Sequence, residues 1–369
     1  MSDLAAARIL VVHDWIVPWG GAERCLQEIM AVVPHADLIV GVRAPTIANL
    51  NAITRRARET WLSRIPFART RHRWFVPIHY AAFRSIDTRG YDMVVSSSFS
   101  FAKAVRASDG RPHVCYCYSP PRYLWDMADT YRSQAGFVSR TALDLSAPLL
   151  RVLDRWSASG VGRFVAISQF VAERIRRAYD RPASVVYPPV AVKDFFEQKA
   201  TERESFLLVV GRLVSYKRVD LAIAAARALG MRLVIAGDGP ERGRLEAMGG
   251  PNVTFLGHVS EAAAADLLNR CRLFLFTAED DFGIAPLEAN AHGAPVVGFG
   301  RGGLTETMVA GSTAVLFAEQ TTESLTAAIT QALGTRWDSA LLQANAARFS
   351  PARFREEIGR ELIGALSGA

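Results

Sequence analysis

Two acids, Asp280 and Glu288, lie eight residues apart on either side of Gly283. The apolar segment 273–277 before them predicts a buried parallel strand, and Pro286 is tolerated near a helix start because its missing N–H would be unpaired there anyway. A helix start offers unpaired N–H groups and partial positive charge to an anion, while acids beside it accept hydrogen bonds from hydroxyl groups. This arrangement suits a sugar nucleotide, although a single acid here is also typical of an ordinary first turn.

The backbone N–H groups of Gly283, Ile284 and Ala285 are expected to face the diphosphate of such a ligand, with Phe282 as a further donor-binding position. Because the chain contains no Asp-x-Asp pair, we expect no metal ion to be required. The positive charge would instead come from side chains.

Two cations, Arg212 and Lys217, follow a second predicted strand at 206–210. Ligands bind where parallel strands end, so both side chains are expected to point to the donor, where they could neutralise a departing diphosphate. Surface ion pairing is the alternative interpretation. A glycine turn at Gly237 follows the next strand in the same way and is a further donor-binding candidate.

A similar order of residues opens the chain. The predicted strand 8–12 leads into His13 and Asp14 and then into Gly20 and Gly21, which would allow close backbone approach to a donor at a helix start. His13 and Asp14 are candidates for a base or for residues that orient the acceptor, with a purely structural role as the alternative.

The candidate residues described so far follow predicted strands in both halves of the chain, so they are expected to lie on two separate sheets. At 369 residues the chain is longer than one core usually supports, and apolar runs alternate with helical patterns throughout, which predicts two α/β Rossmann-like domains facing across a cleft. We place the domains at 1–188 and 189–350, joined by a stiff elbow at 187–190 and a polar stretch at 197–204, with a helix at 351–369 packing back across the hinge. The further predicted strands are 38–42, 92–96, 113–118, 163–167, 232–236, 253–256 and 295–298, and the predicted helices include 22–33, 169–179, 219–229, 241–248, 260–270 and 286–292.

Composition indicates a globular protein and bears on its location and on the state of its cysteines. Half of the residues are hydrophobic and the beginning of the chain resembles neither a signal peptide nor a membrane span, so a cytoplasmic location is expected. The four cysteines form no Cys-x-x-Cys pair or zinc-type spacing and are expected to be reduced, mostly buried thiols.

The net charge of +7 implies acidic partners, and the charge is unevenly placed. Between Arg55 and Arg84 there are eight arginines, one acid and several aromatic residues, a mixture typical of a surface that meets anionic lipids. An ordinary solvated insertion is the alternative. Nucleic acid is disfavoured because no recognition motif accompanies the basic segment. The expected membrane contacts are Arg69, Arg71, Arg73 and Trp74.

The motifs in the second half together resemble those of the family 4 retaining glycosyltransferases: Gly211-Arg212 with Lys217, the Gly237 turn, Phe255-Leu256-Gly257 and the acids of 280–288. This resemblance spans essentially the whole chain and implies a GT-B fold, with the donor held mainly by the second domain and the acceptor by the first. It also implies that Arg212 and Lys217 contact the diphosphate, that Asp280 lies near the sugar and that Glu288 binds the ribose. Asp280 departs from the family, which has a glutamate there.

The block 115–126 is similar to one in bacterial polysaccharide mannosyltransferases of this family. A histidine commonly stands there at the position of Tyr118, so Tyr118 is a hydrogen-bonding substitute beside the donor sugar or a residue that only packs. Arg122 and Lys103 are candidates for the acceptor's phosphates, and Asp126 for a base or an acceptor-orienting role.

The resemblance implies a retaining transfer by front-side attack, with no protein nucleophile and with Arg212, Lys217, Asp280 and Tyr118 as the catalytic candidates. The expected reaction moves mannose from GDP-mannose onto a polyprenyl-diphosphate-linked oligosaccharide in cell-surface polysaccharide synthesis, at the inner face of the cell membrane, beside anionic lipids. Two alternatives remain: a sugar-nucleotide epimerase of the same fold, and a non-enzymatic protein that binds sugar nucleotides or anionic lipids.

Overall fold

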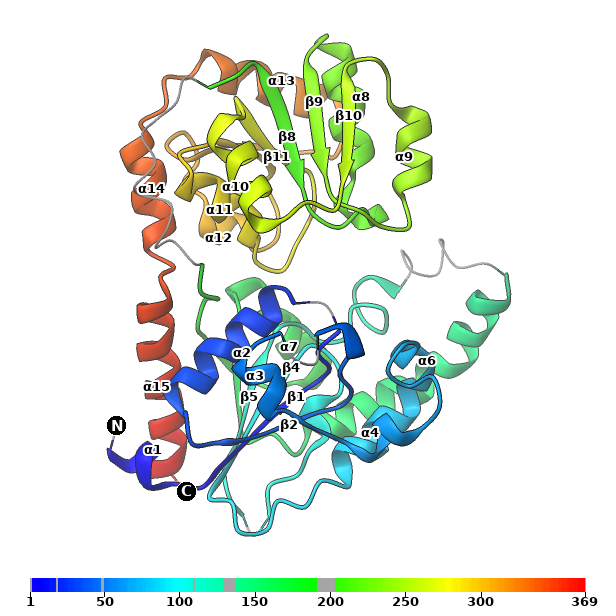
Figure 1. Cartoon of the computed structure of the whole chain (residues 1–369), viewed down its shortest axis with the longest axis vertical. Coiled ribbons are helices and arrows are strands. Elements are labelled where there is room, and N and C mark those ends of the chain that lie inside the picture. Colours follow the sequence, from blue (N-terminus) through cyan, green and yellow to red (C-terminus); the bar gives the residue numbers. More distant parts are fainter. Residues whose placement is uncertain are drawn as a thin grey trace. The chain divides into compact units, whose positions relative to one another are not determined.

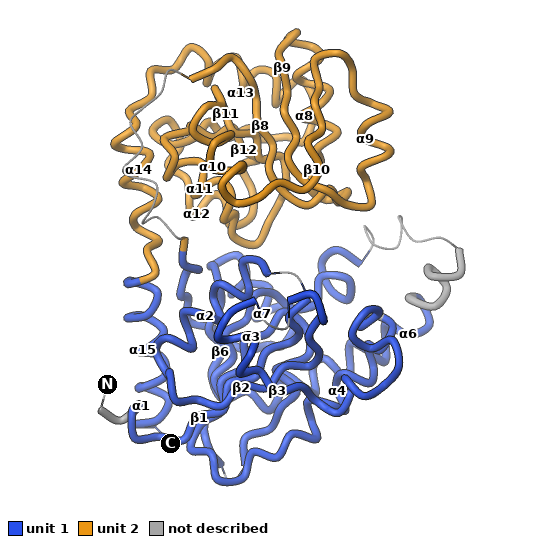
Figure 2. Tube along the Cα trace, in the orientation of Figure 1, with its two compact units in different colours: residues 1–189, 352–369 blue, residues 190–351 orange. Residues whose placement is uncertain are grey.

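The chain forms two compact units, Met1–Pro189 with Ala352–Ala369 and Val190–Pro351 (Figure 2). In this computed structural model, the described residues are 2–17, 19–47, 50–108, 110–128, 137–190 and 203–368. Most of the predicted polar stretch 197–204 lies outside them. Each unit is an α/β structure built on a parallel sheet, as the sequence predicts.

Unit 1 contains a seven-stranded parallel sheet in the order β3-β2-β1-β4-β5-β6-β7. Figure 1 labels its central strands β1, β2, β4 and β5. Its strands are β1 (Ile9–His13), β2 (Asp37–Val40), β3 (Arg58–Glu59), β4 (Met93–Ser98), β5 (His113–Cys117), β6 (Arg163–Ala166) and β7 (Ala183–Val185).

The helices of unit 1 are α1 (Ser2–Ala6), α2 (Gly21–Val32), α3 (Ala52–Arg56), α4 (Val76–Arg84), α6 (Phe137–Ala158), α7 (Gln169–Tyr179) and α15 (Pro351–Ser367), with short 3-10 turns η1 (Pro45–Ile47), η2 (Trp61–Arg64), η3 (His72–Phe75) and η4 (Ala102–Ala104).

Unit 2 contains a six-stranded parallel sheet in the order β10-β9-β8-β11-β12-β13. The strands are β8 (Phe206–Val210), β9 (Arg232–Ala236), β10 (Val253–Gly257), β11 (Leu273–Phe276), β12 (Val296–Phe299) and β13 (Ala314–Phe317). The helices are η5 (Ser215–Lys217), α8 (Val219–Ala228), α9 (Arg242–Met248), α10 (Glu261–Arg270), α11 (Ile284–Ala291), α12 (Leu304–Thr307), α13 (Thr322–Gly334) and α14 (Ser339–Ala347).

The central strands are buried on both faces. In β11, Leu273 and Leu275 join a core shared with α8 and α13, while the intervening Phe274 is equally buried and α10 and α11 also contact the sheet. Strands covered on both sides are expected to be continuously apolar, which is the pattern of β1 and β11.

Each sheet reverses its strand order once. The reversal lies between β1 and β4 in unit 1 and between β8 and β11 in unit 2. In open parallel sheets, the carboxyl ends of the strands at such a reversal are where ligands bind. The residues that follow these four strands are therefore where a site is expected.

The final helix, α15, begins at the predicted position and packs within unit 1. Phe354 is fully buried, with its ring centroid 5.5 Å from that of Tyr116, and Arg355 lies 2.8 Å from Glu28 of α2. Among the described residues, no helix is both long and apolar enough to span a membrane. All four cysteines are free and buried.

Candidate active site

In unit 2, two of the predicted site residues are in direct contact. Lys217 Nζ lies 2.6 Å from Asp280 Oδ2, and both side chains remain about one-fifth exposed. Two further contacts fix the lysine: Thr277 Oγ1 donates to its carbonyl at 2.6 Å, and its ammonium lies 5.1 Å from the centroid of the Phe276 ring. The segments after β8 and β11 therefore bring a cation and an acid to the same point.

Arg212 lies at this point too. A small cavity at the ends of β8 and β11 is lined by Gly211, Arg212, Lys217, Thr277 and Ala278, among others. The two predicted diphosphate-binding cations thus line one cavity at the strand-order reversal. This placement agrees with the expectation that ligands bind beyond the strand ends.

Helix α11 begins at Ile284, two residues before Pro286, which was expected at the helix start. Gly283 precedes the helix at φ +89°, a backbone region that strongly favours glycine. The first N–H groups of a helix have no partner within it, so the turn presents donors beside Asp280. Glu288 is half-buried on the second turn.

Phe282 requires a correction. Its side chain is buried, with its ring centroid 5.6 Å from that of Phe349, so the ring packs inside unit 2 and does not offer a surface to a donor. A contact between this residue and the donor would have to come from its backbone.

The loop that carries the acids is held by a glycine pair after β12. Gly303 N donates to Asp280 O at 2.8 Å, and a Cβ atom at Gly302 would lie 2.5 Å from the same oxygen. Gly302 also has a φ of +76°. Only glycine fits this close approach, so the pair fixes the position of Asp280.

A second close contact between two backbone segments positions Arg212. A Cβ atom at Gly237 would lie 1.8 Å from Gly211 O, and Leu213 N donates to Asp238 O at 2.9 Å. The Gly237 turn, which was predicted to bind the donor, is therefore explained by packing against the loop that bears Arg212.

In unit 1, Tyr118 ends a chain of hydrogen bonds. Its hydroxyl donates to Ala22 O at 2.8 Å and lies 2.8 Å from Ser97 Oγ, which lies 3.0 Å from His13 Nδ1. A carbonyl can only accept, so the Tyr118 proton goes to Ala22, Ser97 donates to Tyr118, and His13 Nδ1 carries a proton that it donates to Ser97. Burial raises the pKa of Tyr118 well above its ordinary value, so the phenol stays protonated.

The other ring nitrogen of His13, Nε2, is buried and has no hydrogen-bond partner among the described residues. It lies 3.8 Å from Glu23 Oε1, while Glu23 Oε2 accepts a hydrogen bond of 2.9 Å from Gly20 N. Gly20 precedes α2 and Gly21 is its first residue, so Glu23 fixes the predicted glycine turn. Glu23 was not among the predicted site residues, although its position three after Gly20 has the spacing of a capping box.

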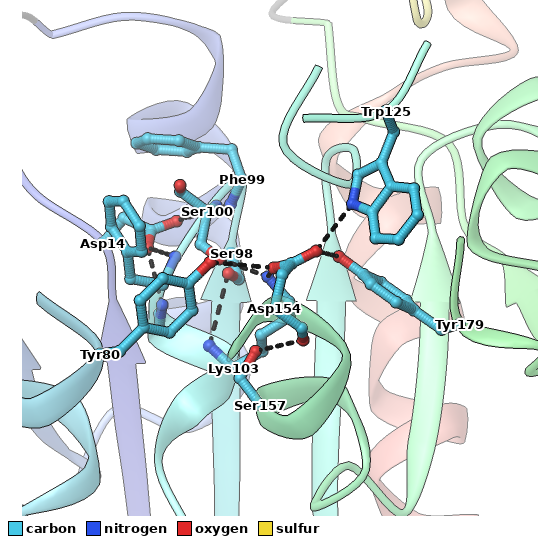
Figure 3. A network of polar contacts seen from close by, with 12 residues as sticks. Asp14, Tyr80, Ser98, Phe99, Ser100, Lys103, Trp125, Asp154, Ser157 and Tyr179 are labelled. Carbon is cyan, nitrogen blue, oxygen red and sulfur yellow. Dashed lines mark hydrogen bonds and ion pairs between the residues drawn. The ribbon is translucent and has the colours of Figure 1, made fainter. Parts of the chain in front are cut away.

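Asp14 does not offer a free carboxylate. It is fully buried and accepts four backbone N–H hydrogen bonds of 2.5–2.9 Å, from Phe99, Ser100, Phe101 and Ala102 (Figure 3). These contacts occupy the lone pairs that a general base would need. The prediction of a base or of an acceptor contact is wrong for this residue, which instead anchors the loop after β4.

Lys103 was predicted to bind acceptor phosphates, and this prediction is also wrong. The side chain is 1% exposed and its Nζ lies 2.6 Å from Asp154 Oδ1 (Figure 3). Burial alone would lower the pKa of Lys103, but the Asp154 carboxylate more than offsets this, and the pKa is raised. Asp154 also accepts hydrogen bonds from the side chains of Tyr80, Trp125 and Tyr179.

The block 119–126 is fixed by α7. Arg174 forms an ion pair with Asp126 and donates to Ser119 Oγ at 3.3 Å. The Asp126 carboxylate is therefore already paired, and Arg122 is half-buried on the same segment.

Of the predicted membrane residues, Arg69 is paired: its Nη2 lies 2.7 Å from Glu59 Oε2. The Arg71 guanidinium lies 4.2 Å from the centroid of the exposed Trp74 ring. The side chain of Arg73 lies outside the described part of the structure.

Within the described ranges, no three His, Cys, Asp or Glu side chains are gathered so that they could hold a metal ion.

Two family models match the chain. Residues 19–194 match the model described as Glycosyltransferase Family 4, and residues 192–348 match that of glycosyl transferases group 1.

Similarity to individual proteins is partial in sequence and extensive in fold. A GDP-mannose-dependent alpha-(1-6)-phosphatidylinositol dimannoside mannosyltransferase of Mycobacterium tuberculosis is 40% identical over 122 residues, 31% of this chain and 32% of that protein. The match thus spans about a third of this curated relative. Sucrose-phosphate synthase of Thermosynechococcus elongatus is 16% identical at a TM-score of 0.75, over 98% of this chain and all of that one. HepE of Anabaena, solved with UDP-glucose, is 18% identical at a TM-score of 0.71, over 96% and 99%.

Proposed function

Since the chain belongs to the family 4 glycosyltransferases of GT-B fold, we propose that it is a retaining hexosyltransferase that moves mannose from GDP-mannose onto a lipid-linked oligosaccharide. The observation that carries the proposal is the convergence of Arg212, Lys217 and Asp280 beside the start of α11, where β8 and β11 end. A leaving diphosphate needs positive charge at one place, and Arg212, Lys217 and the start of α11 supply it together.

The reaction uses no protein nucleophile. The acceptor hydroxyl attacks the anomeric carbon on the face that the diphosphate leaves, and a diphosphate oxygen takes the hydroxyl proton. Arg212, Lys217 and the N–H groups at the start of α11 stabilise the charge that develops on the leaving group.

The contact between Lys217 and Asp280 suits this role. An ammonium group has three donors, so Lys217 can keep its contact with Asp280 and donate to a phosphate oxygen as well. Asp280 can in turn accept a hydrogen bond from a sugar hydroxyl through its remaining lone pairs. Glu288 binds the ribose hydroxyls in this proposal.

The choice of donor and acceptor rests on the named mannosyltransferase relative, which the chain matches over part of its length. A polyprenyl-diphosphate carrier would place the enzyme at the inner face of the cell membrane, where the basic unit 1 surface meets anionic lipids. No metal ion takes part, because side chains and a helix start carry the charge compensation.

The test is donor consumption, with and without a lipid-linked acceptor, from GDP-mannose and UDP-glucose. Lys217→Ala and Arg212→Ala should each lower kcat by roughly 10²- to 10³-fold, as for the loss of one charge-stabilising donor. Arg244→Ala is the matched control, because Arg244 pairs on the surface of unit 2 with Glu241. Near-full activity of either site variant would overturn the diphosphate assignment, and binding without consumption of any donor would favour a non-enzymatic protein.

Three further measurements settle the chemistry. An α-configured product from an α-linked donor supports retention, whereas an inverted product excludes the proposed front-side attack. Epimerised nucleotide sugar without transfer would indicate the epimerase alternative. Activity should persist in excess EDTA, and complete loss that magnesium restores would contradict the absence of a metal.

A further inference from the structure

Helix α6 of unit 1 displays an apolar stripe that the proposed reaction does not use. Leu145, Leu149, Val152 and Trp156 are 79%, 62%, 63% and 44% exposed. Their spacing of four, three and four residues places them on one face of the helix. Single exposed apolar residues are ordinary, but a continuous row of four marks an interaction surface.

Unpaired positive charge lies at one end of this stripe. The guanidinium groups of Arg84 and Arg106 lie 5.8 and 5.2 Å from the centroid of the Trp156 ring. In the part of the chain that the structure describes, neither arginine forms an ion pair, although Arg106 Nη2 donates to Trp156 O and to Ser159 Oγ, at 3.0 Å each. Burial, followed by the charge of Arg84, lowers the pKa of Arg106. Two cations are therefore held close together with no acid beside them.

Helix α4 extends the same surface. The exposed positions Pro77, Ala81 and Arg84 recur every three or four residues and so lie on one face of α4, and the exposed Trp74 lies in the turn η3 just before the helix. At one end of this face Arg71 lies against Trp74, and at the other Arg84 lies against Trp156 of α6. Helices α4 and α6 are in contact, and Figure 1 shows them side by side in unit 1.

We propose that this surface, the α4–α6 face, docks on a membrane that carries anionic lipids. It comprises Arg71, Trp74, Ala81, Arg84, Arg106, Leu145, Leu149, Val152 and Trp156. The apolar stripe enters the boundary between headgroups and acyl chains, the two tryptophans lie at that boundary, and the arginines bind lipid phosphates. The inference deepens the proposed function and rests on it, because a lipid-linked acceptor requires the enzyme at a membrane.

The charge pattern favours an anionic membrane over a second copy of the chain as the partner of this face. A second copy of the chain would bring its own unpaired arginines to the contact, whereas a phosphate-bearing surface supplies the missing negative charge. The one exposed acid among the described α6 side chains is Asp144, more than two turns from Trp156. The face also differs from the contacts predicted from the basic segment: it omits Arg69, which Glu59 neutralises, and it adds α6, which lies outside that segment.

The experiment measures cosedimentation of the full chain with phosphatidylcholine vesicles, with and without phosphatidylglycerol, over a range of salt. Leu145→Gln/Leu149→Gln removes apolar contact at exposed helix positions, where glutamine is a good helix former. Arg84→Glu reverses one charge. The matched controls are Leu341→Gln on α14, where the leucine is 53% exposed, and Arg360→Glu on α15, where the side chain is 68% exposed.

Wild type should bind only the anionic vesicles. The double leucine variant should bind about tenfold more weakly or worse at all salt concentrations, because burial of apolar groups is not screened. Arg84→Glu should lose binding at low salt, with an effect that shrinks as salt rises. Both controls should bind as wild type does.

The proposal is overturned if wild type does not bind anionic vesicles, or if both face variants bind like their controls. It is also overturned if the leucine variant changes only the oligomeric state in light scattering, because the face would then join two copies. Donor consumption by the same proteins in vesicle-free buffer separates the two proposals. Consumption without vesicle binding defeats the docking face alone, and vesicle binding without consumption defeats the proposed function alone.

Discussion

The Tyr118 hydroxyl bonds to groups of unit 1 on both sides, so we expect its removal to affect stability more than chemistry. Tyr118→Phe should lower the free energy of unfolding by roughly 1–3 kcal/mol, because the Ala22 carbonyl loses its donor and Ser97 its acceptor. Urea unfolding measures the first effect and steady-state kinetics the second. A large loss of kcat with an unchanged free energy of unfolding would instead indicate that Tyr118 takes part in the reaction, in the role of the family histidine.

Two buried histidines should make the protein sensitive to mild acid. Burial is the main cause that lowers the pKa of His113 in unit 1 and of His292 in unit 2 from 6.5 to about 4. Above pH 6.5 neither the folded nor the unfolded chain protonates these rings. Between pH 6.5 and 4 these histidines bind protons in the unfolded chain but not in the folded chain, so the free energy of unfolding falls as pH falls. The fall is at most about 1.4 kcal/mol per pH unit for each histidine.

The measurement is the urea midpoint at a series of pH values from 6.5 downward. His113→Gln should flatten the pH dependence, whereas replacement of the exposed His35 by glutamine should leave it unchanged. Equal pH slopes in wild type and His113→Gln would show that the ring is protonated in the folded chain.

At the scale of elements, the loop after β11 depends on its contact with the glycine pair after β12. Gly302→Ala adds a Cβ atom 2.5 Å from Asp280 O at a φ of +76°. Gly311→Ala is the matched control, because its φ is +78° and a Cβ atom there meets nothing within 4 Å. Both variants bear similar backbone strain, of order 1 kcal/mol or more. Only Gly302→Ala should also displace Asp280.

Calorimetric titration with the donor nucleotide measures this difference. Gly302→Ala should bind the donor more weakly than Gly311→Ala by roughly tenfold or more, since a shift of about 1 Å in a positioned group can cost a hundredfold in rate. Equal donor affinity in the two variants would show that the Asp280 loop does not need the glycine contact.

The elements that the sequence predicts well are those with a strong local signal. The buried strands β1, β8 and β11 consist almost wholly of apolar residues and fall within a residue of their predicted bounds. The two-residue strand β3, Arg58–Glu59, has no apolar residue and forms only by pairing with β2 at the sheet edge. Helix α6 was not predicted because it contains Pro148 and because apolar residues such as Leu145, Leu149 and Val152 lie on its exposed face.

The site residues, like the elements, include some that local sequence predicts and some that it does not. Lys217 and Asp280 were each predicted at the donor site, and the structure brings them into contact because the segments after β8 and β11 meet at the reversal of strand order. The error at Lys103 could not be avoided from local sequence. Its burial depends on Asp154, which lies 51 residues later on a helix that was not predicted.

At the scale of the whole molecule, the chain enters unit 2 once and returns to unit 1 for its last residues. The terminal helix α15 is therefore part of the unit 1 core, in which Phe354, Ile358 and Leu362 are fully buried. Chain ends usually tolerate truncation, but the tolerance depends on how much of the segment is buried. The return of the chain makes unit 1, and not unit 2, sensitive to loss of this helix.

Removal of residues 352–369 should accordingly destabilise unit 1 and leave unit 2 folded, because unit 2 is continuous in sequence and has its own core. Hydrogen exchange resolved by peptide should show faster exchange in α2 and β5, which lose their contacts with Arg355 and Phe354, while exchange in β8 and β11 stays slow. Phe354→Ala in the full chain should act in the same direction, with a loss of roughly 3–5 kcal/mol. The control truncation ends the chain at Gly364 and keeps all three buried side chains in place. If the longer truncation left exchange in α2 and β5 unchanged, or accelerated it in β8, α15 would not be a structural part of unit 1.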